Sequence, residues 1–122
     1  MTLLDAISQV NELTPNGYSQ KQKIVWLSRV DAMTKQFIDS HENGSETGFS
    51  SYTENTPLDT VLLIPEPYDE AYIHWLEAQI HYANDDIDSY NNAISMFYTA
   101  FDGYKDFYRK RHTPKGLRRF LF

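Results

Sequence analysis

The fold is decided by residues 65–112, PEPYDEAYIHWLEAQIHYANDDIDSYNNAISMFYTAFDGYKDFYRKRH. Apolar or aromatic residues recur there at steps of three and four, which is the period of one helix face. In the second half they are Ile87, Tyr90, Ile94, Phe97, Phe101, Tyr104 and Tyr108. Asn84 suits the left-handed end of one helix, and Asp85 or Asp86 suits the N-cap of the next. The stretch therefore predicts two long antiparallel helices joined by a short turn.

Two further helices are predicted upstream. Residues 3–13 have an amphipathic pattern that ends at Pro15-Asn16-Gly17, because proline cannot continue a helix and Asn-Gly favours a turn. Ser19 and Gln22 form a capping-box pattern, and a second helix is expected from there to about Asp39. Its apolar face is formed by Trp26, Val30, Met33 and Phe37. The expected fold is all-α, a small helical bundle dominated by the long antiparallel hairpin.

The helical period is interrupted between these two pairs of helices. Residues 41–57, HENGSETGFSSYTENTP, are rich in Gly, Ser, Thr and Asn and are predicted to form a loop. Such a long loop is usually functional or disordered. Residues 58–64, LDTVLLI, are predicted to be extended, and a single strand has no expected pairing partner inside one copy of the chain. Residues 1–112 are thus expected to form one helical domain, followed by a C-terminal tail at residues 113–122.

Composition limits the classes of protein that fit. A chain of 122 residues forms one domain. It has no cysteine, which excludes disulfides, thiolate nucleophiles and zinc knuckles. No apolar run approaches the roughly 20 residues of a membrane span, and the first residues lack the basic leader of a signal peptide. We expect a soluble protein made in the cytoplasm, with no membrane partner.

The charge is distributed unevenly along the chain. Residues 1–104 contain four basic and sixteen acidic residues, whereas residues 105–122 contain seven basic residues and one acid. These segments therefore carry net charges of −12 and +6. An acidic body disfavours general binding of nucleic acid, and a basic tail is typical of an interaction arm.

One helix face offers possible metal ligands. His74, Glu77, His81 and Asp85 are spaced by three or four residues, and imidazoles with a carboxylate can bind a metal at such steps. The favoured interpretation is a polar stripe facing solvent or a partner, because one helix rarely supplies a whole metal site. No metal or cofactor is therefore expected.

Catalytic interpretations have simpler explanations. The acid pairs at 69–70 and 85–86 could suggest acid–base catalysis, but both lie at predicted helix starts, where capping and the helix dipole account for them. No nucleophile elbow or glycine-rich phosphate loop is present in the sequence. The aromatic stripe could stack on single-stranded nucleic acid, but residues 65–104 contain no Lys or Arg to interleave with it. The chain is not expected to be an enzyme.

The C-terminal tail has the composition of a docking peptide. Exposed apolar side chains are costly to leave in water, and here they alternate with guanidinium groups. We expect partner contacts from the tail and from the helix end that precedes it. The residues concerned are Arg111, Lys115, Leu117, Arg118, Arg119, Phe120, Leu121 and Phe122.

Several sequence blocks resemble a known family. They are YSQ at 18–20, WLS at 26–28, LDTVLLIPEPYDE at 58–70, HWLEAQI at 74–80, YAN at 82–84 and YNNA at 90–93. Together they resemble the head–tail connector, or adaptor, proteins of long-tailed bacteriophages and prophages. The resemblance covers most of the chain, but it rests on overall pattern because the family has no catalytic signature.

The resemblance implies a virion structural protein. Connectors of this family form a ring, here expected to have twelve copies, beneath the portal and join it to the tail-side neck proteins. The tail would engage the portal, and Leu62 and Ile64 in the extended segment would pair with a neighbouring subunit or neck protein. DNA would pass through the ring without specific binding. The location would be the host cytoplasm during assembly and then the virion neck.

An interaction protein of another kind remains the alternative. A small regulator or inhibitor encoded by a mobile element would use the same tail, or the tyrosine-rich face, to bind a host protein.

Overall fold

The computed structural model describes residues 1–41 and 49–112, and these contain four helices. The helices are α1 (Leu3–Leu13), α2 (Gln20–His41), α3 (Glu70–Ala83) and α4 (Ile87–Arg111). Within these two ranges the only β-type pairing is an isolated antiparallel bridge between Thr2 and Val61. The prediction of an all-α fold is confirmed. None of the four helices is long and apolar enough to cross a membrane.

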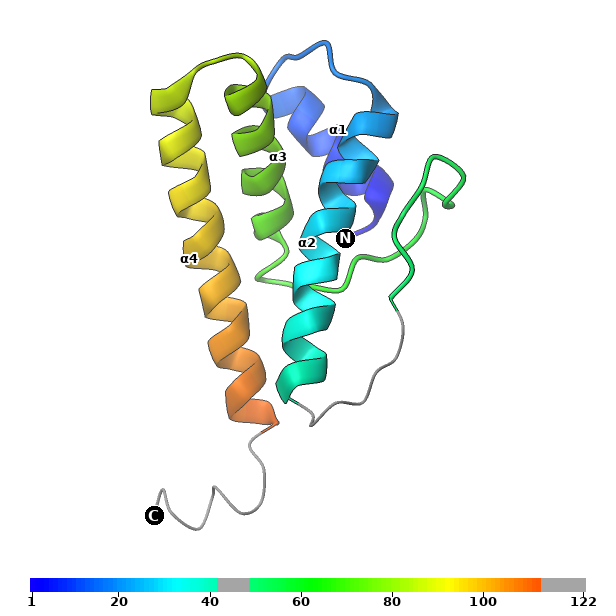
Figure 1. The fold of residues 1–122 in the computed structure, drawn as a ribbon, viewed down its shortest axis with the longest axis vertical. Coiled ribbons are helices and arrows are strands. Elements are labelled where there is room, and N and C mark those ends of the chain that lie inside the picture. Colours follow the sequence, from blue (N-terminus) through cyan, green and yellow to red (C-terminus); the bar gives the residue numbers. More distant parts are fainter. Residues whose placement is uncertain (42–48, 113–122) are drawn as a thin grey trace.

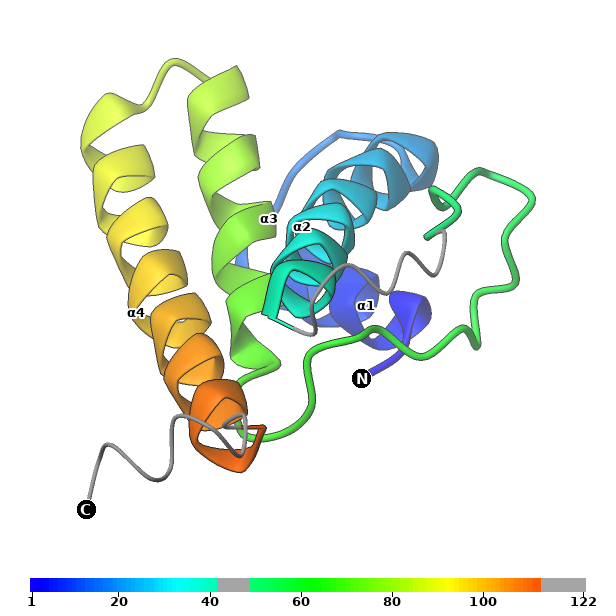
Figure 2. The ribbon, with the colours of Figure 1, turned by 60° about the horizontal axis from the view of Figure 1, so that its bottom comes forward.

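Helix α3 lies between α4 on one side and α1 with α2 on the other (Figures 1 and 2). Residues 84–86 connect α3 directly to α4, so the two helices run in opposite directions. The left-handed residue of this turn is Asp85, with φ 58°, and the prediction that Asn84 would take this conformation was wrong. Asn84 has φ −90° and donates its N–H to Ile80 and His81, as in a continuing helix. Asp86 is the N-cap of α4 and accepts the N–H of Ser89 at 3.2 Å.

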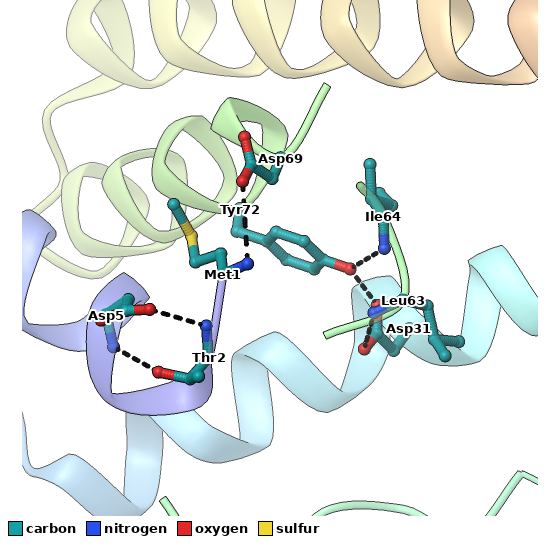
Figure 3. Close-up of polar contacts among 8 residues, drawn as sticks. All are labelled: Met1, Thr2, Asp5, Asp31, Leu63, Ile64, Asp69 and Tyr72. Carbon is teal, nitrogen blue, oxygen red and sulfur yellow. Dashed lines mark hydrogen bonds and ion pairs between the residues drawn. The ribbon is translucent and has the colours of Figure 1, made fainter. Parts of the chain in front are cut away.

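The starts of α1 and α2 are fixed by side-chain caps. Thr2 and Asp5 form a reciprocal capping box, with Thr2 N–H donating to Asp5 at 3.0 Å and Asp5 N–H to Thr2 at 3.1 Å (Figure 3). Before α2, Ser19 Oγ accepts the N–H of Gln22 at 3.1 Å, as its sequence pattern indicated.

The core contains aliphatic side chains from all four helices and the extended segment, together with a cluster of aromatic rings between α2, α3 and α4. Phe97 is fully buried, and its ring centroid lies 4.9 Å from that of Trp75. Trp75 is half-buried and donates its indole N–H to the carbonyl of Trp26 at 2.9 Å. Of the predicted apolar face of α4, the buried members are Phe97, Phe101, Tyr104 and Tyr108, whereas Ile87 is exposed. The apolar face of α4 is therefore buried from its middle to its C-terminal end.

The described part of the connection between α2 and α3, residues 49–69, passes along the side of α1 and α2 that faces away from α4 and then returns to the start of α3 (Figure 1). Residues 49–57 contain no helix or strand, in agreement with the predicted loop, while residues 42–48 lie outside the described residues. The Glu66–Pro67 peptide bond is cis. Helix α3 then begins at Glu70, with Asp69 as an N-cap whose side chain makes no capping bond and lies 3.8 Å from the amino group of Met1 (Figure 3).

Candidate partner-binding groove

The extended segment at residues 58–64 pairs with the start of the same chain. Leu62 N–H donates to Met1 at 2.9 Å, Leu3 N–H to Thr60 at 3.1 Å and Leu4 N–H to Leu58 at 3.0 Å. The prediction that one copy offers this segment no pairing partner was therefore wrong. The sequence did not indicate residues 1–4 as the pairing partner, because their pattern is that of the beginning of a helix.

Side chains of this segment alternate between the core and the surface. Leu62 and Ile64 are 3% and 0% exposed, whereas Val61 and Leu63 are 67% and 37% exposed. Successive side chains of an extended chain point to opposite faces, which explains the alternation. The prediction that Leu62 and Ile64 contact a partner is corrected here, since both are buried in the core of their own subunit. Val61 and Leu63 are the residues that this segment presents outward.

A buried carboxylate holds the segment in place. Asp31, on α2, is 0% exposed and accepts the N–H of Leu63 at 3.1 Å. It also accepts the hydroxyl of Tyr72, on α3, and the same hydroxyl accepts the N–H of Ile64 at 2.7 Å (Figure 3). The Asp31 carboxylate and the Tyr72 hydroxyl thus accept hydrogen bonds from two consecutive backbone amides, those of Leu63 and Ile64. A buried amide needs such a partner where it is not paired with a neighbouring strand.

Tyr52 brings the loop into the same network. Its hydroxyl donates to Asp31 at 2.5 Å, and its backbone N–H donates to Ser28 Oγ at 3.0 Å. Both acceptors lie on α2, so the loop is fixed at two points on one helix. Asp31 therefore joins α2, the loop, the extended segment and α3.

Burial governs the electrostatics of this network. It raises the pKa of Asp31 above its ordinary value, and the hydrogen bonds from Tyr52, Tyr72 and Leu63 oppose that rise. Burial, together with the nearby charge of Asp31, also raises the pKa of Tyr52 and Tyr72. Both phenols therefore remain protonated and act as donors. No ion pair to Asp31 occurs among the described residues.

A groove lies on the outer side of the extended segment, residues 58–64. It has a volume of about 500 Å³ and is lined by α2, the loop and the extended segment. The lining includes Lys35, Phe49, Tyr52, Thr60, Val61 and Leu63. Most of these side chains are apolar or aromatic, as is usual in sites that bind a side chain or peptide.

The groove is bordered by a short open backbone edge at Val61. Thr2 and Val61 face each other between two flanking hydrogen bonds, Leu3 N–H to Thr60 and Leu62 N–H to Met1. In such an antiparallel pair, the N–H and C=O of Val61 point away from the partner strand. Neither group takes part in a backbone–backbone hydrogen bond within residues 1–41 and 49–112. An extended peptide could pair there and place its side chains in the groove.

The predicted tail contacts fall mainly beyond the described residues. Lys115, Leu117, Arg118, Arg119, Phe120, Leu121 and Phe122 all lie outside them. Arg111 ends α4, is exposed and places its guanidinium 5.4 Å from the centre of the Phe107 ring. The helix end that precedes the tail is therefore exposed and basic, with Arg109, Lys110 and Arg111 in the last turn.

The histidine stripe of α3 lines a separate polar hollow. His74, Glu77 and His81 face Ser89 and Asn92 of α4 around a volume of about 250 Å³. Glu77 accepts the hydroxyl of Thr14 at 3.1 Å and lies 3.6 Å from His74 Nδ1. His81 Nδ1 lies 4.0 Å from Asp86. Within the described part of the chain, no group of three or more such side chains is arranged to hold a metal ion.

Sequence reasoning missed Asp31 and Tyr52. One signal could have found Asp31: with Ile24 and Leu27 it forms a 24–27–31 stripe at helical spacing, in which an acid is out of place. No local signal marks Tyr52, because its partners Ser28 and Asp31 lie on α2, more than 20 positions away in the sequence. No family model matches the chain, and no curated protein or solved structure matches it either.

Proposed function

We propose that this protein is a non-enzymatic structural component of a bacteriophage neck, a head–tail connector. It joins the portal at the head vertex to the tail-side proteins and assembles as a ring, of twelve copies on the portal, around the DNA channel. The phage assignment rests on the sequence blocks that resemble connector proteins, chiefly residues 58–70 and 74–84.

The observation that supports a binding role most strongly is the groove beside the extended segment, whose backbone is held in place by hydrogen bonds. The buried carboxylate of Asp31, two phenols and the backbone of residues 63 and 64 are used to hold an extended edge in a fixed position. A rigid edge loses little conformational entropy when a partner strand pairs with it, so binding is favoured. In the proposed neck, this groove receives an extended segment of a tail-side protein.

The two ends of the molecule suit different contacts. The basic end of α4 and the tail engage the portal through Arg111, Lys115 and the apolar and basic residues 117–122. The body, with a net charge of −12 over residues 1–104, suits the wall of a DNA channel, because like charge repels the duplex and prevents specific binding.

A pull-down with the portal protein encoded in the same genome tests this proposal. We expect the full-length chain to bind the assembled portal, and a variant lacking residues 117–122 to fold normally but to lose binding. A matched control, Tyr98→Phe, alters an exposed residue of α4 and should bind as the full-length chain does.

The result also distinguishes the alternative function. Failure of the full-length chain to bind the portal, with stoichiometric capture of one host protein instead, would replace the connector with a small regulator or inhibitor of a mobile element. Such a regulator would use the same tail, or the tyrosine-rich face.

A further inference from the structure

The groove beside Val61 is an apolar surface that the described residues leave open. Val61 and Leu63 project outward along it, and Phe49 packs edge-to-face on Tyr52 at 5.2 Å on its other side. We propose that in the free subunit this groove is filled by residues 117–122 of the same chain, which pair in an extended conformation with the backbone of Val61. This docking needs no portal and goes beyond the connector role.

The first argument is composition. Two stretches of the chain lie outside the described residues, and only one of them can fill an apolar groove. Residues 42–48, ENGSETG, contain no large apolar side chain. Residues 117–122, LRRFLF, contain four, and an apolar side chain gains roughly 1.5–3 kcal/mol when it leaves water for a fully buried site.

The second argument is charge. Lys35 is the one basic residue in the groove lining, and its ammonium group lies 3.1 Å from the carboxylate of Asp39. The groove therefore does not repel a peptide that carries Arg118 and Arg119. Asp59, two residues before Val61, is exposed and adds an acidic group near the open edge.

The third argument is reach. The end of α4 lies against the end of α2, since His41 Nε2 is 2.8 Å from the carbonyl oxygen of His112 and the rings of Phe37 and Tyr108 are 5.4 Å apart. Lys35 precedes His41 by six residues, which is about 9 Å along the helix axis and a third of the way around it. Six extended residues from Arg111 to Leu117 span up to about 20 Å. The tail is therefore long enough to reach Lys35, at the α2 side of the groove, in its own subunit.

Tethering favours this intramolecular contact over one between copies. Residues 113–116 tether the tail to α4, and a tether this short corresponds to an effective concentration in the millimolar range, well above a micromolar concentration of a second copy. When a portal takes the tail, the groove becomes free for the next neck protein. Tail capture would thus set the order of assembly and prevent free subunits from associating early.

Paramagnetic broadening in the full-length protein tests the proposal without a portal. Because the chain has no cysteine, Gly116→Cys provides a single site for a nitroxide label at the start of the tail. We expect the methyl signals of Val61 and Leu63 to lose most of their intensity. The methyl signals of Ile87, at the opposite end of α4, should keep theirs.

Two controls decide the outcome. Adding Phe120→Ser and Leu121→Ser to the labelled chain should restore the Val61 and Leu63 signals; failure to restore them, or no broadening at all, would overturn the proposal. The second control mixes spin-labelled, isotopically silent protein with unlabelled, isotope-enriched protein. Equal broadening in this mixture would also overturn the proposal, because the occupant would then be the tail of a second copy.

Discussion

Tyr72 on α3 donates its hydroxyl to the buried carboxylate of Asp31 on α2, although 41 positions separate them in sequence. The same hydroxyl accepts the N–H of Ile64. These two hydrogen bonds tie α2 and α3 to the extended segment, which lines the groove.

Removing that hydroxyl should destabilise the fold. Tyr72→Phe leaves the N–H of Ile64 and one oxygen of Asp31 without their partner in a fully buried place. We expect the free energy of unfolding to fall by about 2–4 kcal/mol, because buried groups left unsatisfied incur their full desolvation cost. Urea denaturation followed by circular dichroism measures it. Tyr98→Phe, at an exposed phenol, should change it by less than about 0.5 kcal/mol; equal losses in both variants would mean that the Tyr72 hydroxyl has no special role.

Asp31→Asn should both weaken the network and change its pH dependence. The carboxylate has two acceptor oxygens, whereas the amide of asparagine has one. At least one of the three donors that Asp31 accepts, the Leu63 N–H or a phenol hydroxyl, would therefore face the NH₂ group instead of an oxygen. We expect a loss of about 1–3 kcal/mol near neutral pH.

The pH profile follows from the raised pKa of Asp31 in the folded protein. A group whose pKa is higher in the folded than in the unfolded chain stabilises the fold fully below the unfolded value, about 3.9, and this contribution is lost as pH rises through the folded value. The stability difference between wild type and Asp31→Asn should therefore shrink as pH rises through that window, then level off. A difference that grows with pH would show that the hydrogen bonds outweigh burial and lower the pKa.

Leu62 is buried and its neighbour Val61 is exposed, so alanine substitutions at these two positions form a matched pair of variants. Leu62→Ala removes a buried side chain and should cost about 2–4 kcal/mol, whereas Val61→Ala removes an exposed one and should cost less than about 0.5 kcal/mol. Thermal or urea unfolding of the two variants measures the difference. A similar cost at both positions would contradict the register set by the Thr2–Val61 bridge.

The interface between α3 and α4 depends on Phe97. This ring is fully buried, and its centroid lies 4.9 Å from that of Trp75 on α3 and 5.4 Å from that of Phe101 on α4. Phe97→Ala should cost about 3–5 kcal/mol, since it leaves a cavity that rigid neighbours fill poorly. Trp75→Ala should cost less, because Trp75 is only half-buried. If the order of the two losses in urea denaturation is reversed, Trp75 is the main anchor of this interface.

The helices were predictable from the sequence because their signals are local. Steps of three and four residues mark the buried face of α4 from Phe97 to Tyr108, and an acid at the right place marks its N-cap at Asp86. The turn residue was misassigned because Asn and Asp both tolerate the left-handed conformation, and the sequence does not choose between neighbours.

The groove was not predictable because its contacts are distant in sequence. The bridge from Thr2 to Val61 and the bonds from Asp31 to Tyr52 and Leu63 connect residues that carry no mutual pattern. The buried role of Leu62 and Ile64 also depends on the bridge, since its register decides which side chains face the core.

Electron microscopy of particles from a phage lacking this gene tests the central claim most directly. The connector proposal predicts filled or leaking heads beside separate, complete tails, and restoration of joined particles when the gene is supplied in trans. Normal infectious particles in the absence of the gene would contradict an essential role at the head–tail joint.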